Sequence, residues 1–108
     1  MEISREFARF DLGTVDEVPD SGIHSQTVYS DGAIRVVLFG FAAGEELSEH
    51  TASRPATIQV LSGAFDITLG GEQVDAPAGT LVHMAAGLRH ALRAREASRM
   101  LLTLLPTT

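Results

Sequence analysis

The side chains of this 108-residue chain with the most versatile chemistry are its four histidines, His24, His50, His83 and His90. A neutral imidazole can ligate a divalent metal ion, and it can exchange a proton near neutral pH. The chain has no cysteine, so a thiol nucleophile and a disulfide framework are both excluded. A functional site must therefore be built from imidazole, carboxylate, hydroxyl and backbone groups.

Two of these histidines stand at fixed distances from glycines. His50 follows Gly44 after five residues in the stretch GEELSEHTASRPATIQVLSG (44–63), which also ends on a glycine. Farther along the chain, Gly87 is followed after two residues by His90. This arrangement resembles the two sequence motifs of the cupin superfamily, in particular its small single-domain members with an RmlC-like jelly roll.

The match to these motifs is incomplete at the residues that carry chemistry. The first motif of the family has a second histidine and a glutamate where this chain has Ala52 and Ala56. The second motif has a proline and an asparagine where this chain has Ala85 and Ala94, while Gly79 stands where the motif begins. The resemblance predicts the fold but selects no single activity, since cupin barrels serve isomerases, dioxygenases, decarboxylases, sugar-binding regulators and storage proteins.

The resemblance also implies a metal site. In metal-binding cupins, three histidines and one glutamate hold iron, manganese, copper, nickel or zinc, and His50 and His90 are the predicted ligands of one divalent metal ion here. Catalytic sites of this type use three protein ligands, so two imidazoles alone should bind weakly. His83 and Arg54 are further candidates. His83 would point outward if the residues on either side of it fill the barrel, and Arg54 could pair with an acidic ligand or stay a solvated surface residue.

The two alanines in the first motif also favour a mostly apolar pocket for a small molecule, because methyl groups replace an imidazole and a carboxylate. The predicted lining consists of Ala52, Ala56, Ile58, Val60, Leu92 and Ala94. In the alternative interpretation, large core residues such as Phe39, Phe41 or Met100 fill this space, since proteins rarely leave an apolar void empty.

Three functional hypotheses follow. The first is a small cupin that binds a divalent metal ion, a small ligand or both in its barrel, as a metal-dependent oxygenase or isomerase. The alternative is a metal-free, small-molecule-binding cupin without catalytic activity. A third is metal-free proton transfer by one neutral histidine, with the anion stabilised by Arg54 or a backbone amide. The sequence leaves open whether the protein is an enzyme. A histidine ring facing solvent would weaken both enzymatic hypotheses.

Short runs of β-branched and apolar residues between turn signals predict the elements that position these groups. The predicted strands cover residues 24–30, 33–41, 56–62, 64–70, 80–85, 89–94 and 99–105. Their spacing predicts an all-β barrel or sandwich with little helix beyond a turn in 14–21. The resemblance makes this a cupin-type double-stranded β-helix, or jelly roll. We expect a single domain over residues 1–108, with N-terminal strands in 1–32 and the barrel core in 33–105.

The charge and the hydropathy of the chain limit the kinds of partner that it is expected to bind. The net charge is −6 and the eight basic residues, all arginines, form no cluster, so nucleic acid is not an expected partner. No apolar run approaches the roughly 20 residues that span a bilayer. The first ten residues carry charges where a signal peptide would need a continuous apolar stretch. We therefore expect a cytoplasmic protein without membrane contact. The runs 36–39 and 100–105 are apolar on both faces, and Phe7, Phe10 and Leu12 lie in a polar N-terminus. With the resemblance, this predicts a homodimer in which the N-terminal strand joins the partner's sheet.

Overall fold

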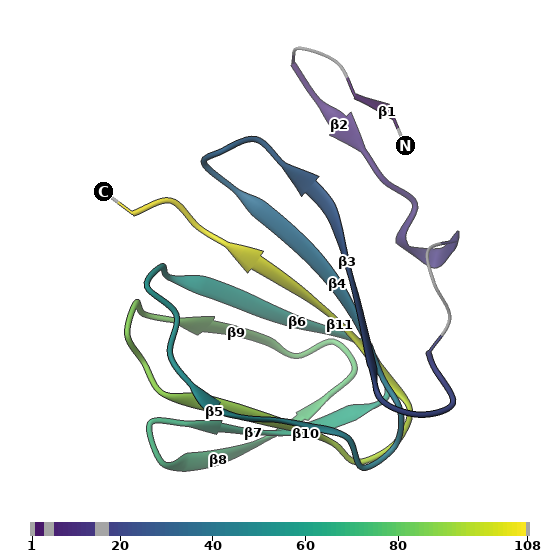
Figure 1. The fold of residues 1–108 in the computed structure, drawn as a ribbon, viewed down its shortest axis with the longest axis vertical. Helices are drawn as coiled ribbons and strands as arrows, with labels where there is room; N and C mark the ends of the chain where they lie inside the picture. The colour runs from purple at the N-terminus through teal and green to yellow at the C-terminus, as the bar shows by residue number, and fades with distance from the viewer. Residues whose placement is uncertain (1, 4–5, 15–17, 108) are drawn as a thin grey trace.

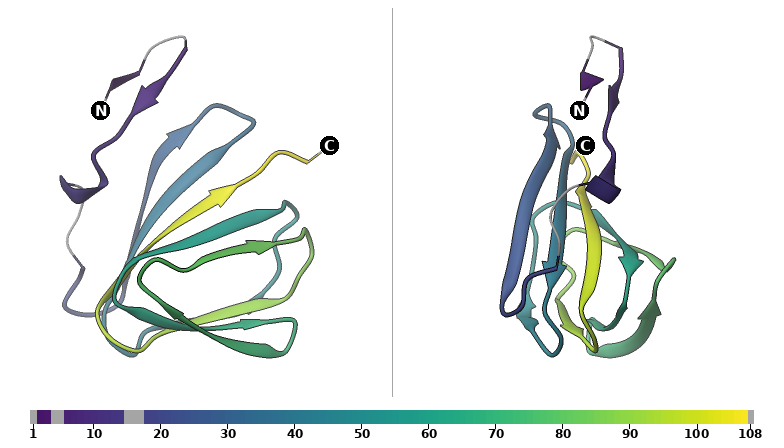
Figure 2. Two further views of the ribbon diagram at one scale, coloured as in Figure 1. Left: turned by 180° about the vertical axis from the view of Figure 1, so that it is seen from behind. Right: turned by 90° about the vertical axis from the view of Figure 1, so that its right-hand side faces the viewer.

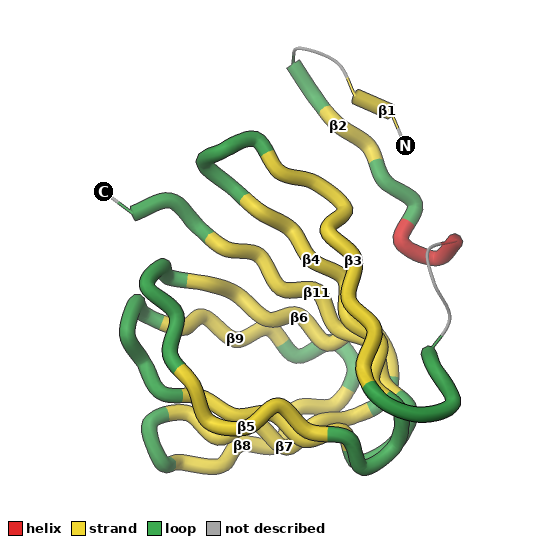
Figure 3. Tube along the Cα trace, in the orientation of Figure 1, coloured by secondary structure: helices red, strands yellow, loops and turns green. Residues whose placement is uncertain are grey.

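The structure, a computed structural model, describes residues 2–3, 6–14 and 18–107. It is built almost entirely from strands and connecting loops (Figure 3). The strands are β1 (Glu2–Ile3), β2 (Ala8–Arg9), β3 (Ile23–Ser30), β4 (Arg35–Phe41), β5 (Glu46–His50), β6 (Ala56–Ser62), β7 (Ala64–Leu69), β8 (Glu72–Pro77), β9 (Leu81–Met84), β10 (His90–Ala94) and β11 (Ser98–Leu104). A short 3-10 helix, Leu12–Thr14, is the one helical segment within the described residues.

The strands of the barrel form two antiparallel sheets that face each other (Figure 1). One sheet has the order β5-β10-β7-β8, and the other has the order β3-β4-β11-β6-β9. The chain therefore passes from sheet to sheet several times, as in a jelly roll. The all-β, cupin-type jelly roll predicted from the sequence is confirmed by this architecture.

Alternation along the strands decides which side chains fill the space between the sheets. On β6, Ala56, Ile58 and Val60 are each 1% exposed, while Gln59 between them is exposed. The two most central aromatic rings, Phe41 and Phe65, come from opposite sheets and meet edge to face at 5.0 Å between ring centroids. An edge-to-face contact is a favoured geometry for buried aromatic rings. The core therefore joins the two sheets into one packed unit.

The predicted ranges located seven of the strands. β1 and β2 fall within the N-terminal strands expected in 1–32, whereas β5 and β8 were not predicted. Both carry several charged or amide side chains, as in ELSEH and EQVDAP, and this composition hides the strand pattern. The turn expected in 14–21 overlaps the 3-10 helix only at Thr14, and residues 15–17 of that expectation lie outside the described residues.

The N-terminal segment lies along the outside of the barrel. Among the described strands, β1 and β2 pair with each other and stand apart from the two sheets (Figure 2). Past β2, the Phe10 ring contacts Tyr29 of β3 at 5.8 Å, and the Arg99 guanidinium of β11 donates a hydrogen bond to the Leu12 carbonyl. The segment thus covers part of the outer face of β3 and β11. In the described part of the chain, no helix has the length and apolar character needed to cross a membrane.

Candidate functional site

His50 and His90 are brought face to face by the pairing of β5 with β10. They are direct cross-strand partners, and their ring centroids lie 4.2 Å apart at an interplanar angle of 62°. The structure therefore brings together the two histidines that the sequence singled out.

A β-bulge makes this meeting possible. Leu47 pairs with Leu92, and His50 pairs with His90. Three residues along β5 therefore match two residues along β10. Strict alternation would put Leu47 and His50 on opposite faces of the sheet. The extra residue of the bulge, at Ser48 and Glu49, lets both side chains share the inner face.

The same local backbone fixes the tautomer of both rings. Nδ1 of His50 lies 2.8 Å from the carbonyl oxygen of Ser48, and Nδ1 of His90 lies 3.0 Å from the carbonyl oxygen of Leu88. A carbonyl oxygen can only accept, so each Nδ1 must carry the proton and donate it. Where such a ring carries no second proton, the lone pair of Nε2 can bind a metal ion or accept a hydrogen bond.

The pair sits at the end of the barrel where the chain twice crosses between the sheets. The segment 51–55 leaves β5 just after His50, and the segment 85–89 returns just before His90. The two crossings are joined by a hydrogen bond of 2.8 Å from the Gly87 amide to the Ala52 carbonyl. His90 is only 6% exposed, whereas His50 is exposed at the rim. One imidazole is thus held within the barrel and the other stands at its opening.

The two other histidines lie elsewhere. His83 is on β9, exposed and paired with Thr57, while its neighbour Met84 is 2% exposed in the core. His83 therefore points away from the barrel interior. His24 is exposed on β3. Within the described residues, no cluster of three or more His, Asp or Glu side chains could hold a metal ion. The donor set at the barrel end is two imidazoles, which fits an open, two-histidine metal site and not the full cage of the cupin motif.

Arg54 has a structural task that neither sequence interpretation foresaw. Its Nε donates to the Leu105 carbonyl at 2.8 Å, and its Nη2 donates to the carbonyl oxygens of Ala33 and Leu104. The guanidinium thereby ties the β5–β6 crossing to the β3–β4 turn and to the end of β11. Nε and Nη2 of Arg54 are thus engaged with backbone carbonyls, and its role toward an acidic ligand stays a prediction.

The residues expected to line an apolar pocket are packed in the core. Ala56, Ile58, Val60, Leu92 and Ala94 are each at most 3% exposed and belong to one buried cluster that includes Phe41, Phe65, Met84 and Met100. Met84 is the cross-strand partner of Ala56, so its thioether side chain lies beside the position where the motif would have its glutamate. Of the expected lining, Ala52 alone lies at the barrel end and is half-buried. The structure thus favours the interpretation in which large core residues fill the space.

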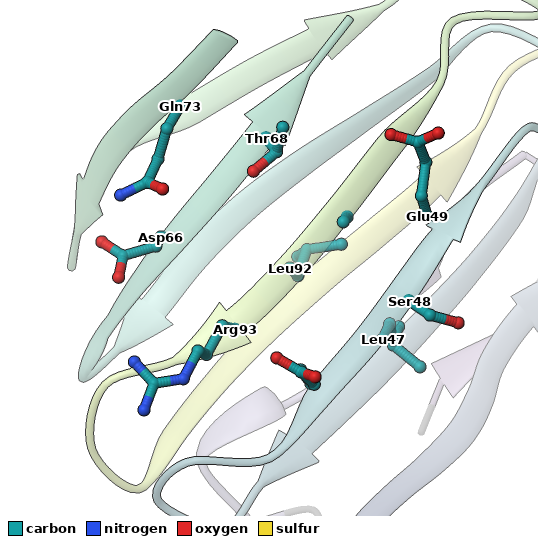
Figure 4. A pocket seen from close by; sticks show the side chains of 10 residues that line it. Leu47, Ser48, Glu49, Asp66, Thr68, Gln73, Leu92 and Arg93 are labelled. Carbon is teal, nitrogen blue, oxygen red and sulfur yellow. The ribbon is translucent and has the colours of Figure 1, made fainter. Parts of the chain in front are cut away.

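A polar groove of about 270 Å³ lies on the outer face of the sheet that carries the histidines (Figure 4). It is lined by Glu46, Leu47, Ser48, Glu49, Asp66, Thr68, Gln73, Ala91, Leu92 and Arg93. Its polar side chains alternate with the core-facing residues of β7 and β10. Part of the groove could be predicted, since Asp66 and Thr68 lie on the polar face of AFDITL, but β5 and β8 were not predicted. The carboxylates of the groove lie behind the sheet and do not join the histidine pair.

Comparison with known proteins agrees with this fold. The family model described as the cupin domain matches residues 37–105, which is more than half of the chain. A conserved protein of unknown function from Streptococcus pyogenes is 28% identical, with a TM-score of 0.83 over 94% of this chain and 89% of that chain. No curated protein matches.

Two further solved structures share the fold at lower identity. An RmlC-like cupin protein from Desulfovibrio desulfuricans is 24% identical, with a TM-score of 0.82 over 93% of this chain and 97% of that chain. KdgF from Halomonas sp. is also 24% identical, with a TM-score of 0.79 over 94% and 96% of the two chains. The fold and the paired histidines at its end define a small single-barrel protein of the jelly-roll class. The chain belongs to the cupin family.

Proposed function

We propose that this small cupin binds a divalent metal ion between Nε2 of His50 and Nε2 of His90, with the remaining coordination positions open to a small ligand. The observation that carries the proposal is the pair of Nδ1 hydrogen bonds to the Ser48 and Leu88 carbonyls. A backbone carbonyl behind each imidazole is the usual means by which proteins orient a metal-binding histidine and raise its basicity.

The spacing of the rings suits this role after a small adjustment. With metal–nitrogen bonds of about 2.1 Å, each ring centroid lies about 3.2 Å from the ion. Two rings that held one ion would stand about 1 Å farther apart than the observed separation of 4.2 Å. His50 is exposed at the end of β5, so its ring can make this movement while His90 stays fixed in the barrel.

A divalent ion bound there supplies a Lewis acid that polarises an oxygen atom of the ligand. The chain's own residues hold and shape the site. His90 anchors it inside the barrel, and His50 presents the second nitrogen at the opening. The hydrogen bond between Gly87 and Ala52 keeps the two crossing segments together beside the pair. His50 is exposed, and a solvent-facing ring weakens the hypotheses of an oxygenase or isomerase, so the proposal is limited to binding of the ion and a small ligand.

The tautomers provide the first test of the proposal. Nitrogen-15 NMR of the histidines should show the proton on Nδ1 of both His50 and His90, and titration with Zn²⁺ should shift both Nε2 resonances. His50→Ala and His90→Ala should each abolish the Zn²⁺-dependent shift of the remaining ring. His83→Ala is the matched control, because it removes an exposed imidazole outside the pair and should leave the titration unchanged. Nε2-protonated rings, or no response to millimolar Zn²⁺, would refute the proposal.

Metal-free binding of a small molecule is the second candidate, favoured by the absence of a third metal-binding side chain beside the pair in the described residues. In that case the two Nε2 atoms accept hydrogen bonds from the ligand. The two functions differ in their response to EDTA, because a chelator abolishes ligand binding only where a metal ion mediates it.

The predicted homodimer stays a prediction, and two features support it. Phe7, beside β2, is 58% exposed, and Leu81 at the start of β9 is 65% exposed. Among the described strands, β1 and β2 form a two-stranded sheet, and such a sheet is only marginally stable by itself. The molar mass from light scattering tests this, because a value near the 11.5 kDa of one chain would contradict it.

A further inference from the structure

We infer that the Asp31–Gly32 step is a modification site, at which isoaspartate forms spontaneously once the turn between β3 and β4 opens. It is the one Asp–Gly step of the chain, and the chain contains no asparagine, so any isoaspartate must come from an aspartate. The inference concerns this turn and does not depend on whether a metal ion binds at the histidine pair.

The reaction needs only groups that the turn already contains. The main-chain nitrogen of Gly32 attacks Cγ of Asp31, so that an N–Cγ bond forms and a Cγ–O bond breaks. The departing oxygen leaves as water, with one proton from the nitrogen and one from the carboxyl group. A water molecule then opens the resulting succinimide ring at the former main-chain carbonyl of Asp31, which yields isoaspartate. One water is lost and one is gained, so the overall change is an isomerisation that needs no enzyme or cofactor.

The surroundings of Gly32 leave its nitrogen open to this reaction. Asp31 and Gly32 are both exposed. Gly32 has a φ of 90°, and a Cβ added there would meet nothing within 4 Å beyond its chain neighbours. A side chain at this position would crowd the attacking nitrogen, and glycine has none. The turn therefore presents the nucleophile without steric hindrance.

Three hydrogen bonds restrain the Asp31 carboxylate in the closed turn. Its Oδ1 accepts from the amides of Ile34 at 2.8 Å and Ala33 at 2.9 Å, and its Oδ2 accepts from the Tyr29 hydroxyl at 3.0 Å. These donors, the Ile34 amide first, hold the pKa of Asp31 below its ordinary value of 3.8. The carboxyl group thus stays ionised and lacks the proton that must leave with its oxygen. Rotation of Cγ toward the Gly32 nitrogen also breaks these bonds, so the closed turn is the protected state and the open turn is the reactive one.

Isomerisation should also loosen a contact between distant parts of the chain. The main chain of isoaspartate runs through Cβ and Cγ and is one methylene longer, so the carboxylate no longer meets the amides of Ala33 and Ile34. The Ala33 carbonyl accepts a hydrogen bond from Nη2 of Arg54, which also donates to the Leu104 carbonyl at the end of β11. Displacement of Ala33 therefore weakens the tie between the β3–β4 turn and β11.

The modification can be measured in the full chain. The protein is kept at neutral pH, either folded in buffer or unfolded in guanidinium chloride, and samples are digested with trypsin at intervals. The tryptic peptide 10–35 contains Asp31. Its isoaspartyl form has the same mass and a different retention time, and electron-transfer fragmentation identifies the modified residue. We expect isoaspartate at residue 31 to form about tenfold or more faster in the unfolded chain, because the hydrogen bonds to the carboxylate are lost.

Tyr29→Phe is the matched variant, because it removes the hydroxyl group and keeps the ring that contacts Phe10. It should raise the rate in the folded protein about two- to tenfold and leave the rate in guanidinium chloride unchanged. Asp20, which precedes Ser21 in the same peptide, is the internal control. Its rate should not respond to Tyr29→Phe.

The effect of the modification on the tie to β11 is tested with Arg54→Ala. The isoaspartyl fraction, separated by ion exchange, should unfold at a lower urea concentration than the unmodified protein. This difference should shrink in Arg54→Ala, because the contact that isomerisation disturbs is already absent there.

Each result decides one part of the inference. The absence of isoaspartate at residue 31 in the unfolded chain would overturn the site itself, and equal rates in the folded and unfolded chain would overturn the protection by the turn. An unchanged folded-state rate in Tyr29→Phe would remove its hydroxyl from the restraint. An equal loss of stability in the parent and in Arg54→Ala would contradict the link to β11. The proposed metal site is tested separately by the zinc titration.

Discussion

Replacing Gly63 by alanine should destabilise the protein far more than the same change at Gly44, although both glycines belong to the first motif. Both have positive φ, 77° at Gly63 and 81° at Gly44, and a left-handed conformation costs an L-residue about 1–2 kcal/mol. A Cβ added at Gly44 meets no atom within 4 Å. At Gly63 it would lie 2.1 Å from Ser98 Oγ and 2.6 Å from the Ala97 carbonyl oxygen. This difference in surroundings makes the two positions a matched pair.

The expected loss of unfolding free energy in Gly63→Ala follows from the atoms that an added Cβ would displace. Gly63 alone separates β6 from β7, and Ser98 is fully buried against this corner, where its Oγ accepts a hydrogen bond from the Ala64 amide at 3.0 Å. Shifting the packed backbone costs about 1–3 kcal/mol. Losing the partner of the part-buried Ala64 amide costs about 1–3 kcal/mol more. We therefore expect Gly63→Ala to lose roughly 3–8 kcal/mol of unfolding free energy, against about 1–2 kcal/mol for Gly44→Ala.

Urea unfolding followed by far-ultraviolet circular dichroism measures both variants, since the chain has no tryptophan for fluorescence. A loss of this size approaches the whole stability of an ordinary domain, about 5–15 kcal/mol. If Gly63→Ala does not fold, Ser98→Ala supplies the second measurement. It removes the hydrogen bond at the same corner without backbone strain and should cost about 1–3 kcal/mol. Equal losses in Gly63→Ala and Gly44→Ala would show that backbone conformation alone, and not the close approach of Ser98, makes Gly63 necessary.

Two further predictions concern groups outside the histidine pair. Arg54→Ala should lower the unfolding free energy by about 1.5–3 kcal/mol, because a charged donor to three carbonyls is lost. Arg89→Ala is the control, because it removes only an exposed ion pair and should change the unfolding free energy by less than about 1 kcal/mol. Similar losses for the two variants in urea unfolding would contradict the role given to Arg54. Hydrogen bonds from the backbone amides of Ile34 and Ala33, and then from the Tyr29 hydroxyl, hold the pKa of Asp31 below its ordinary value of 3.8. A depressed folded-state pKa gives stability that is present above pH 3.8 and is lost as the pH falls through the folded-state pKa. Asp31→Ala should therefore destabilise the β3–β4 turn at neutral pH, with a penalty that shrinks below pH 3.8, and a penalty independent of pH would count against this assignment.

The core of the fold could be predicted from the sequence because it depends on period-two alternation. ATIQVLS and AFDITLG show this pattern directly, and β6 and β7 begin at the predicted residues. β5 could not be predicted in the same way, since its bulge breaks the alternation between Leu47 and His50. The polar composition of β8 hid it for a different reason, because its outward face dominates the pattern and only Val74 and Ala76 turn inward.

The candidate site was predictable in part. The spacing of motif glycines identified His50 and His90, and their direct pairing then required only that β5 and β10 be neighbours. The sequence did not determine whether side chains fill the barrel beside the two histidines. Whether Ala56 leaves a void depends on the side chain across the strand, and the partner Met84 is set by the register of β6 with β9. The role of Arg54 likewise depends on carbonyls that lie 21, 50 and 51 residues away in the chain.

The two cupin motifs thus separate into a part that makes the fold and a part that makes the site. The glycines act through the backbone: Gly63 turns the corner between β6 and β7, and Gly87 donates the hydrogen bond that joins the two crossing segments. Neither task depends on the ligands, so Ala52 and Ala56 can replace a histidine and a glutamate without loss of the barrel. The two remaining histidines keep their backbone partners on Nδ1, an arrangement that core packing does not require. These Nδ1 hydrogen bonds leave Nε2 as the nitrogen that can meet a ligand, and this is the physical reason to look for a ligand at the pair and not in the packed core.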